Sequence, residues 1–289
     1  MAVINPISTL AVEEIKNYIC KIETRFDADV LYLNGPISPE LIGLLQFEVN
    51  ELRKEMTNNK LCVMLTTNGG DANTTERVVY IFRHFYDEVE FIIPDYAYSA
   101  GTILCMSGDK IWMNYGSVLG PIDPQVMNKE GKFVPALGYL EKINSLLVKA
   151  QNNTLSEAEF LILKDFDLAE LSQYEQARDL TTELLKDWLV KYKFKNWNTH
   201  SSSKKPVSLR EKKKRAEKIA KDLADYSHWK SHGRPLNIEV LTKELKLQID
   251  DFGMSDDVQD NILSLQSIVV DFMRINSFQA LVLTRRTNI

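Results

Sequence analysis

Three apolar stretches of strand length, alternating with helix-like stretches, constrain the fold of this chain most. The stretches at 28–37, 61–67 and 89–94 are rich in leucine, β-branched and aromatic residues, and each runs into turn-forming residues. Between them, over 41–52 and 73–85, apolar residues recur at helical spacing. Strands that alternate with helices in this way predict an α/β fold, with a mostly parallel sheet and crossover helices.

Further elements follow the same reasoning. Helical periodicity predicts helices over 9–23, 136–151 and 256–274, and the pairs Ser156/Glu159 and Ser208/Glu211 have the spacing of capping boxes. The pair Asn73/Glu76 predicts a capped start for the helix that ends near 85. The segments 110–113 and 245–249 are interpreted as short strands, and 196–207 as a polar loop.

The composition excludes several classes of protein. With 289 residues, 44% hydrophobic and 26% charged, the chain has the composition of a soluble globular protein. Its net charge of −5 argues against nucleic-acid binding by the molecule as a whole. No stretch approaches the ~20 apolar residues of a membrane span, and the first residues lack the features of a secretory signal. We therefore expect a cytoplasmic protein with no membrane segment.

The three cysteines, Cys20, Cys62 and Cys105, lie in apolar stretches and do not have the spacing of metal ligands. We expect buried, reduced thiols and no metal site. The basic run at 212–215 is interpreted as the solvated face of a helix, with contact to an acidic partner as the alternative.

A serine turn follows the third strand. Ser99 is flanked by small residues and precedes the apolar run 103–106, so it lies where a strand would pass into a helix. There the hydroxyl of Ser99 could face a ligand beside the N–H groups that begin the helix, as a serine nucleophile requires. A plain helix N-cap is the structural alternative.

A glycine pair, Gly69 and Gly70, follows the second strand. In parallel sheets, ligands bind at the carboxyl ends of the strands, so this pair and Ser99 are expected to converge on one site. Glycines at such a place allow a substrate backbone to come close, although a simple turn would also explain them.

Four motifs in this order resemble the Clp-protease/crotonase superfamily. They are Asn-Gly-Pro-Ile at 34–37, Asn-Gly-Gly at 68–70, Ser-Ala-Gly-Thr at 99–102 and Gly-Pro-Ile-Asp-Pro-Gln at 120–125. The last is particularly similar to the serine dehydrogenase proteinase branch, which is related to signal peptide peptidase A. The segment from His232 to 249 is similar to the closing segment of the superfamily.

The resemblance implies a Clp/crotonase-like sheet with a helical insertion. The expected organisation is an N-terminal helix over 1–24, a catalytic core over 25–155, a helical insertion over 156–225, and over 226–289 a closing segment of the core with a C-terminal helix. The superfamily commonly assembles into rings or trimers, so a homo-oligomer is expected.

The same resemblance implies a serine peptidase that cleaves peptide bonds through an acyl-enzyme on Ser99. It also implies an oxyanion hole formed by backbone N–H groups around Gly70 and of Ala100, with Gly69 and Gly70 close to the substrate. No cofactor is expected, because no dinucleotide fingerprint or pyridoxal-type site is present. The expected partner is a peptide or protein substrate, not nucleic acid, and relatives also allow a membrane partner.

The general base has two candidates. The Clp branch places a histidine about 25 positions after its serine, but this chain has the 121–124 segment there instead. By resemblance to Ser-Lys proteases the base is Lys142, on a predicted apolar helix where partial burial would lower its pKa. The rival is His232, which the closing-segment match places near the serine. Asp123 is a candidate to orient the base, or merely a turn residue.

Two other readings compete with the peptidase. A crotonase-like enzyme that binds acyl-CoA would share the fold and the oxyanion hole without a nucleophilic serine. A catalytically silent interaction subunit would share the fold alone, and neither base candidate would lie within reach of Ser99.

Overall fold

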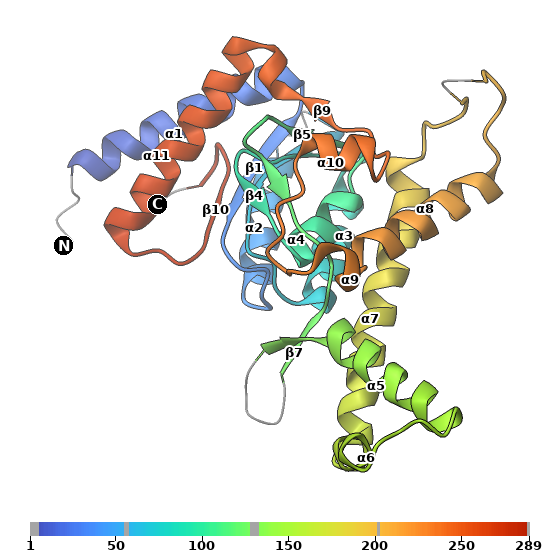
Figure 1. Ribbon diagram of the computed structural model, residues 1–289. Coiled ribbons are helices and arrows are strands. Elements are labelled where there is room, and N and C mark those ends of the chain that lie inside the picture. The colour runs from blue at the N-terminus through green and yellow to red at the C-terminus, as the bar shows by residue number, and fades with distance from the viewer. Residues whose placement is uncertain (1–5, 55–57, 128–132, 201–202, 288–289) are drawn as a thin grey trace.

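A single six-stranded sheet forms the centre of the molecule (Figure 1). The structure, a computed structural model, describes residues 6–54, 58–127, 133–200 and 203–287. The strand order is β10-β1-β2-β3-β5-β9, and every neighbouring pair is parallel except β10 and β1. The prediction of a mostly parallel α/β sheet is therefore confirmed.

The sheet strands are short. They are β1 (Asp29–Asn34), β2 (Lys60–Thr66), β3 (Glu88–Ile92), β5 (Lys110–Met113), β9 (Asp250–Asp251) and β10 (Leu281–Leu283). Two small pairs lie beside it: β4 (Tyr96–Ala97) with β6 (Val118–Leu119), and β7 (Gln125–Met127) with β8 (Phe133–Pro135).

Eleven α-helices and two other helical segments make up most of the remaining structure of the described residues. They are α1 (Pro6–Phe26), α2 (Leu41–Arg53), α3 (Ala72–Phe85), α4 (Ala100–Met106), α5 (Ala136–Gln151), α6 (Glu157–Lys164), α7 (Leu168–Trp188), the π-helix η1 (Leu189–Lys193), α8 (Leu209–Leu223), α9 (Tyr226–Trp229), α10 (Ile238–Lys243), the 3₁₀ helix η2 (Phe252–Met254) and α11 (Asp256–Asn276). None of the described helices has both the length and the apolar character of a membrane span.

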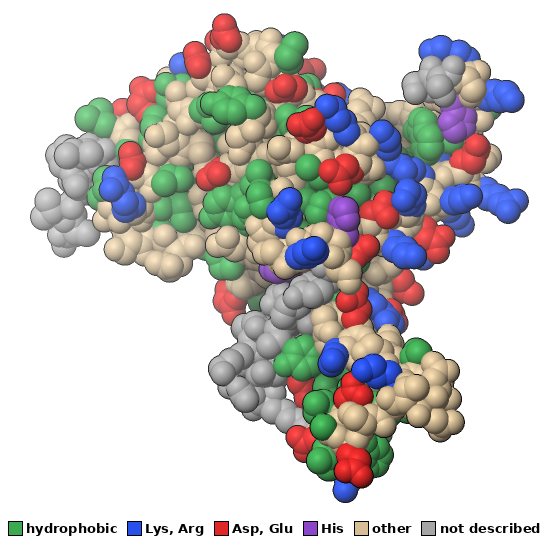
Figure 2. Space-filling view, viewed as in Figure 1, with side chains coloured by type: hydrophobic (Ala, Val, Ile, Leu, Met, Phe, Trp, Pro, Cys, Tyr) green, Lys and Arg blue, Asp and Glu red, His purple; other side chains and the backbone are tan. Residues whose placement is uncertain are grey.

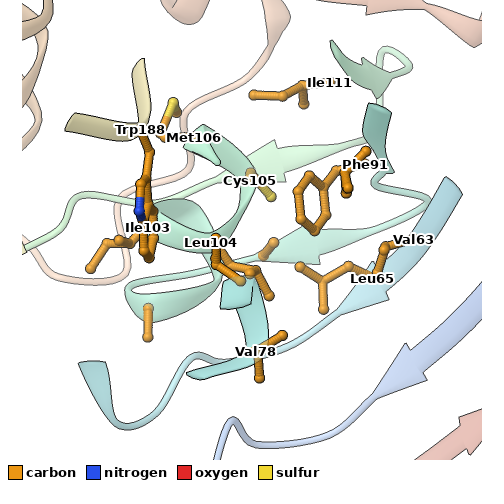
Figure 3. Packing of buried hydrophobic residues seen from close by; sticks show 14 of the residues in the cluster. Val63, Leu65, Val78, Phe91, Ile103, Leu104, Cys105, Met106, Ile111 and Trp188 are labelled. Atoms are coloured by element: carbon orange, nitrogen blue, oxygen red, sulfur yellow. The ribbon is translucent and has the colours of Figure 1, made fainter. Parts of the chain in front are cut away.

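Alternation along the central strands divides the core into two layers. Along β2, Leu61, Val63 and Leu65 face the layer of α2, α3 and α4, whereas Cys62 and Met64 face α1 and α11. All five side chains are buried, which explains why the strand reads as a continuous apolar run. Figure 3 shows the first layer, in which Phe91 and Val63 of the sheet pack beneath Leu104 and Cys105 of α4.

The helices after residue 156 contribute to the same core. Leu184, Leu185 and Trp188 of α7 belong to the cluster that includes the sheet residues, as do Ile219 and Leu223 of α8. Trp188 lies beside Ile103 and Met106 of α4 (Figure 3). By contrast, α5 and α6 project away from the sheet (Figure 1), and α6 has no buried residue.

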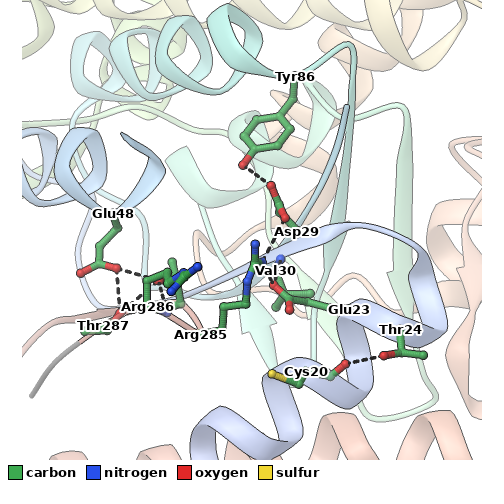
Figure 4. A network of polar contacts seen from close by, with 11 residues as sticks. Cys20, Glu23, Thr24, Asp29, Val30, Glu48, Tyr86, Arg285, Arg286 and Thr287 are labelled. Atoms are coloured by element: carbon green, nitrogen blue, oxygen red, sulfur yellow. Dashed lines mark hydrogen bonds and ion pairs between the residues drawn. The ribbon is translucent and has the colours of Figure 1, made fainter. Parts of the chain in front are cut away.

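A polar clasp joins the chain near its C-terminus to the first strand (Figure 4). The Arg285 guanidinium forms ion pairs with Glu23 of α1 and Asp29 of β1, and the Tyr86 hydroxyl donates to the Asp29 carboxylate at 2.8 Å. The hydroxyls of Thr284 and Thr287 both donate to Glu48 of α2. Because these groups are mostly buried, they keep strand β10 in place on the sheet edge.

Most predicted elements are confirmed, including the helices at 9–23, 136–151 and 256–274 and both capping boxes. Three details were wrong. Segment 245–249 is not a strand, because only Asp250 and Asp251 reach the edge of β5. The N-cap of α3 is Asp71, whose carboxylate accepts from the Thr74 N–H at 2.6 Å. Cys20 is exposed on α1, whereas the other two cysteines are buried.

Candidate active site

The serine turn has a strained backbone. Ser99 lies between β4 and α4 with φ 54° and ψ −118°, a conformation that residues with a side chain rarely adopt. It occupies the N-cap position of α4, but its side chain makes no capping hydrogen bond. The Ser99 hydroxyl is therefore not used to hold the helix together, and the plain N-cap alternative does not account for it.

Close packing around the turn holds this conformation in place. The Gly101 position touches Thr67, because a Cβ there would lie 2.4 Å from the Thr67 methyl group. The Thr102 hydroxyl donates to the carbonyl of Ala97 at 2.8 Å, and the Gly120 N–H donates to the same hydroxyl at 3.0 Å. The last two residues of the Ser-Ala-Gly-Thr motif, Gly101 and Thr102, thus each fit a specific neighbour.

The glycine pair lies directly against the serine turn. A Cβ on Gly69 would come within 2.8 Å of the Ser99 Cβ, and one on Gly70 within 2.1 Å of the Ile37 carbonyl oxygen. Both glycines also have positive φ, 101° and 152°. Only glycine meets both requirements here, so the predicted close approach is a property of the fold.

Two backbone N–H groups beside Ser99 have no partner among the described residues. The Gly69 carbonyl and the Asp71 N–H both bond Ile37, each at 2.9 Å, so the N–H of Gly70 between them points to the other side. The Ala100 N–H begins α4, where a helix has no acceptor of its own to offer. Both residues line the same cavity as Ser99.

This cavity has a volume of about 830 Å³. Ile37, Gly70, Ser99 and Ala100 form its floor, at the carboxyl ends of the strands. The opposite wall comes from α7, which presents Gln173, Gln176, Ala177, Leu180 and Thr181 at helical spacing. No lysine or arginine is among the described residues that line the cavity.

His232 also lines the cavity. Its ring is partly buried, and burial lowers the pKa of this imidazole below its ordinary value. Its Nδ1 is buried and has no hydrogen-bond partner among the described residues. The structure therefore brings together Ser99, Gly69, Gly70, Ala100 and His232, although no hydrogen bond joins Ser99 to His232.

Lys142 is not part of this arrangement. It lies on the exposed side of α5 and does not line the cavity. The partial burial expected for Lys142 is wrong for this structure, because Leu140 and Ile143 turn inward while Lys142 between them turns outward. α5 belongs to the part of the molecule that projects from the sheet (Figure 1).

Asp123 is not among the described lining residues, although its neighbours in the sequence, Ile122 and Pro124, both line the cavity. It is 1% exposed, and burial raises the pKa of its carboxyl to about 6. Its Oδ1 accepts from the Leu137 N–H at 3.3 Å, and its Oδ2 has no partner among the described residues. No hydrogen bond connects it to His232, so its expected role in orienting the base stays a prediction.

The comparison with known families identifies the chain. A model of ClpP-like SDH-type serine proteinases matches residues 49–205, more than half of the chain, and this range includes the glycine pair and the serine turn. The chain belongs to this family. The resemblance seen in the four sequence motifs is therefore confirmed for this SDH-type proteinase, and Ser99 lies in the matched range.

Two uncharacterized proteins of Methanocaldococcus jannaschii are similar to this SDH-type proteinase. One is 31% identical over 125 residues, which are 43% of this chain and 38% of the relative. The other is 26% identical over 199 residues, which are 69% of this chain and 56% of the relative. The matches thus span at most just over half of the length of these relatives.

Two solved structures are also similar. Both are mutants of 1510-N, a membrane-bound stomatin-specific protease. One, in complex with a substrate peptide, is 20% identical and covers 43% of this chain and 60% of its own, with a TM-score of 0.33. The other is 21% identical and covers 51% and 76%, with a TM-score of 0.32.

Sequence reasoning missed the wall of the cavity that α7 supplies. The region around α7 reads as helical and charged, and nothing in its local pattern marks Ala177 or Leu180 as facing Ser99. The only local signal is a run of small or uncharged residues at i, i+3, i+4, i+7 and i+8, from Gln173 to Thr181, on an otherwise charged helix.

Proposed function

We propose that this SDH-type proteinase is a serine endopeptidase whose nucleophile is Ser99. The observation that carries the proposal is the strained Ser99 turn, which presents an unbonded hydroxyl to a cavity beside two N–H groups without partners. Membership of a serine proteinase family supports the same conclusion.

In this mechanism the Ser99 oxygen attacks the carbonyl carbon of a peptide bond. The oxyanion that forms is stabilised by hydrogen bonds from the N–H groups of Gly70 and Ala100. The base takes the proton from Ser99 and gives it to the leaving amine, which leaves an acyl-enzyme. Water, activated by the same base, then hydrolyses the ester and restores Ser99.

We assign the role of base to His232. It is the one ordinarily basic side chain among the described residues that line the cavity, and its lowered pKa keeps the imidazole neutral and able to accept a proton at pH 7. Lys142 remains the alternative base. Its side chain would have to move from its exposed position on α5 to reach Ser99.

The acyl-CoA alternative fits the cavity less well. The phosphates of CoA carry several negative charges, and proteins bind such groups with arginine, lysine or helix N-termini. Here the described lining residues include no lysine or arginine, and the N-terminus of α3, which also lines the cavity, is already capped by the Asp71 carboxylate. The Asp71 carboxylate in the lining would also repel the phosphates, whereas it would not repel a polypeptide without acidic side chains.

Covalent labelling with a fluorophosphonate probe tests the nucleophile. We expect the probe to label the wild-type chain at Ser99, identified by mass spectrometry of the labelled peptide. Ser99→Ala should abolish both labelling and the cleavage of an unstructured protein such as casein. Peptide cleavage that survives in Ser99→Ala would overturn the proposal, and an unlabelled, inactive wild type would favour the silent subunit.

Matched variants test the base. His232→Gln should lower kcat at least ~100-fold, because general-base catalysis is commonly worth that much. Lys142→Gln should keep kcat within about twofold, since its side chain is exposed and is not among the described residues that line the cavity. The reverse result would assign the base to Lys142.

A further inference from the structure

Positive charge is concentrated in one part of this chain. Residues 191–221 contain twelve lysines and arginines and two acidic residues, whereas the rest of the chain contains twenty-three basic and thirty-eight acidic residues. Figure 2 shows the blue side chains gathered over α8 and the loop before it, apart from the mixed surface elsewhere. The net charge of −5 therefore conceals a basic face on an acidic molecule.

The arrangement of α8 concentrates this charge in a line. Arg210, Lys213, Lys214, Lys218 and Lys221 follow one another at spacings of three, one, four and three residues and so share one side of the helix. The acidic Glu217 lies on the same side, among these five cations. We call these five residues the basic stripe. It extends about 16 Å along the helix, at the usual rise of 1.5 Å per residue.

Most of the basic stripe has no partner. The neighbouring Lys212 donates to the carbonyls of Phe194 and Lys195, and Arg215 to that of Leu245, so these two cations hold local structure together. Within the stripe, Lys218 pairs with Asp222 at 3.0 Å. The other four cations form no hydrogen bond or ion pair with any described residue.

Four pairs of stripe cations lie three or four residues apart and repel one another, whereas Glu217 lies within three or four residues of Lys213, Lys214 and Lys221 and attracts them. The stripe keeps an excess of positive charge that an anionic partner can neutralise.

The basic stripe is structurally connected to the cavity. α8 packs along α7, and α7 forms the wall of the cavity that faces Ser99. The described residues that line the cavity include no lysine or arginine, and they include Asp71, so the cavity offers no cation to an acidic substrate. Attraction of an acidic substrate must therefore come from outside it.

We propose that the basic stripe is a docking surface for an acidic segment of the polypeptide substrate, which it recruits to the Ser99 cavity. This inference rests on the proposed peptidase function. An extended acidic segment of about five residues would match the length of the stripe, at roughly 3.3 Å per residue.

The surface favours an acidic polypeptide over other polyanions. The stripe includes no aromatic side chain on which a nucleic-acid base could stack. The apolar side of α8, formed by Ala216, Ile219, Ala220 and Leu223, is buried in the core and cannot enter a lipid bilayer.

A binding measurement tests the stripe without any catalysis. The probe is a fluorescein-labelled peptide of twelve residues rich in glutamate, titrated with the full-length Ser99→Ala chain and followed by anisotropy. Replacing Arg210, Lys213, Lys214 and Lys221 with glutamine should weaken binding at least about tenfold, and 0.5 M salt should do the same to the unsubstituted stripe.

A matched control removes four cations elsewhere. Lys54, Arg77, Lys243 and Arg274 are all exposed, and replacing them with glutamine changes the net charge equally. Binding of the acidic peptide should then stay within about twofold. Equal weakening in both variants, or no weakening in the first, would overturn the proposal. So would tighter binding of an oligonucleotide or of vesicles containing phosphatidylserine than of the acidic peptide.

A kinetic comparison connects the stripe with cleavage. For a peptide substrate that carries an acidic tail, the stripe variant should raise KM about tenfold and leave kcat unchanged, while a neutral-tailed peptide is cleaved as before. Labelling of Ser99 by the fluorophosphonate should not change. If wild-type Ser99 proves unreactive, the peptidase proposal fails, and the anisotropy comparison still decides whether the stripe binds acidic polypeptide.

Discussion

At Ser99, the proposed nucleophile and backbone strain coincide. A serine held at φ 54° and ψ −118° costs about 1–3 kcal/mol relative to relaxed backbone, and a glycine would adopt the same conformation without that cost. The surrounding contacts of Gly69, Gly101 and Thr102 hold the turn in this shape. The strained backbone is therefore the conformation in which the Ser99 hydroxyl is presented to the cavity, and the fold is less stable by the energy of this strain.

This strain predicts that Ser99→Gly stabilises the fold while it removes the nucleophile. We expect the free energy of unfolding to rise by about 1 kcal/mol, because relief of the strain exceeds the greater entropy of glycine in the unfolded chain. Urea denaturation measures the change, and fluorophosphonate labelling should disappear. Ser99→Ala, which keeps the Cβ, serves as the control and should show no such gain.

The proposal that His232 is the base predicts how cleavage depends on pH. Because burial lowers its pKa, the imidazole loses its proton below the ordinary histidine value of about 6.5. The value of kcat/KM should therefore be constant near pH 7 and decrease only as the pH falls through the lowered pKa. An initial-rate profile between pH 4.5 and 9 measures this decrease. An inflection in the alkaline range would instead indicate a lysine base.

The lowered pKa of His232 also makes folding stability depend on pH. The folded chain binds this proton less readily than the unfolded chain, so His232 makes the protein less stable as the pH falls through the ordinary histidine value. Thermal melts at each pH therefore accompany the rate profile. Rates are compared only where the melts show the protein to be folded.

At the scale of elements, α7 has two functions along its length. Its middle part, between residues 173 and 181, lines the cavity, and its last part, with Leu184, Leu185 and Trp188, anchors it in the main core. Trp188 is 6% exposed and packs against α4, the helix that begins at the serine turn. The position of the cavity wall therefore depends on packing well away from the cavity itself.

Trp188→Ala should accordingly destabilise the protein by about 3–5 kcal/mol, the usual cost of deleting a buried tryptophan side chain. In the fraction that remains folded at low temperature, peptide cleavage should decrease more than fluorophosphonate labelling. The reason is that a peptide would contact the cavity wall formed by α7, whereas the small probe reacts at Ser99 without contacting α7. Denaturation and the two activity measurements check this. Trp197→Ala, at a more exposed tryptophan, is the control, and equal effects at both positions would contradict the prediction.

Secondary-structure elements that depend on their own residues could be predicted from the local sequence. The strands around 31, 63 and 91 and the capping boxes were predictable because each depends on its own residues. The turn at 99 and the glycines at 69 and 70 were predictable for the same reason. The error at 245–249 arose because Leu245 and Leu247 alternate with polar residues, as in a strand. Both side chains are buried, but the segment that carries them pairs with no other strand.

Other features depend on long-range packing. His232 reaches the cavity, and Lys142 does not, because of how distant helices pack. The wall formed by α7 has the same origin, and no local pattern shows it.

At the scale of the whole molecule, the homo-oligomer expected from the resemblance stays a prediction. Light scattering of the purified chain at micromolar concentration should give a mass that is a multiple of the monomer mass. Dilution into the nanomolar range should then lower both the mass and any cleavage activity together if assembly supports the site. A single monomer mass at all concentrations would contradict the expectation.

The polar clasp of Arg285 has a consequence for biosynthesis. Asp29 and Arg285 are 256 residues apart in the sequence, and β10 is the only described strand that covers the outer edge of β1. While the chain emerges from the ribosome, β1 can pair with β2 long before β10 exists, so one sheet edge stays open during most of translation. Until residues 281–285 have been made, the outer edge of β1 is therefore open to pairing with strands of other chains.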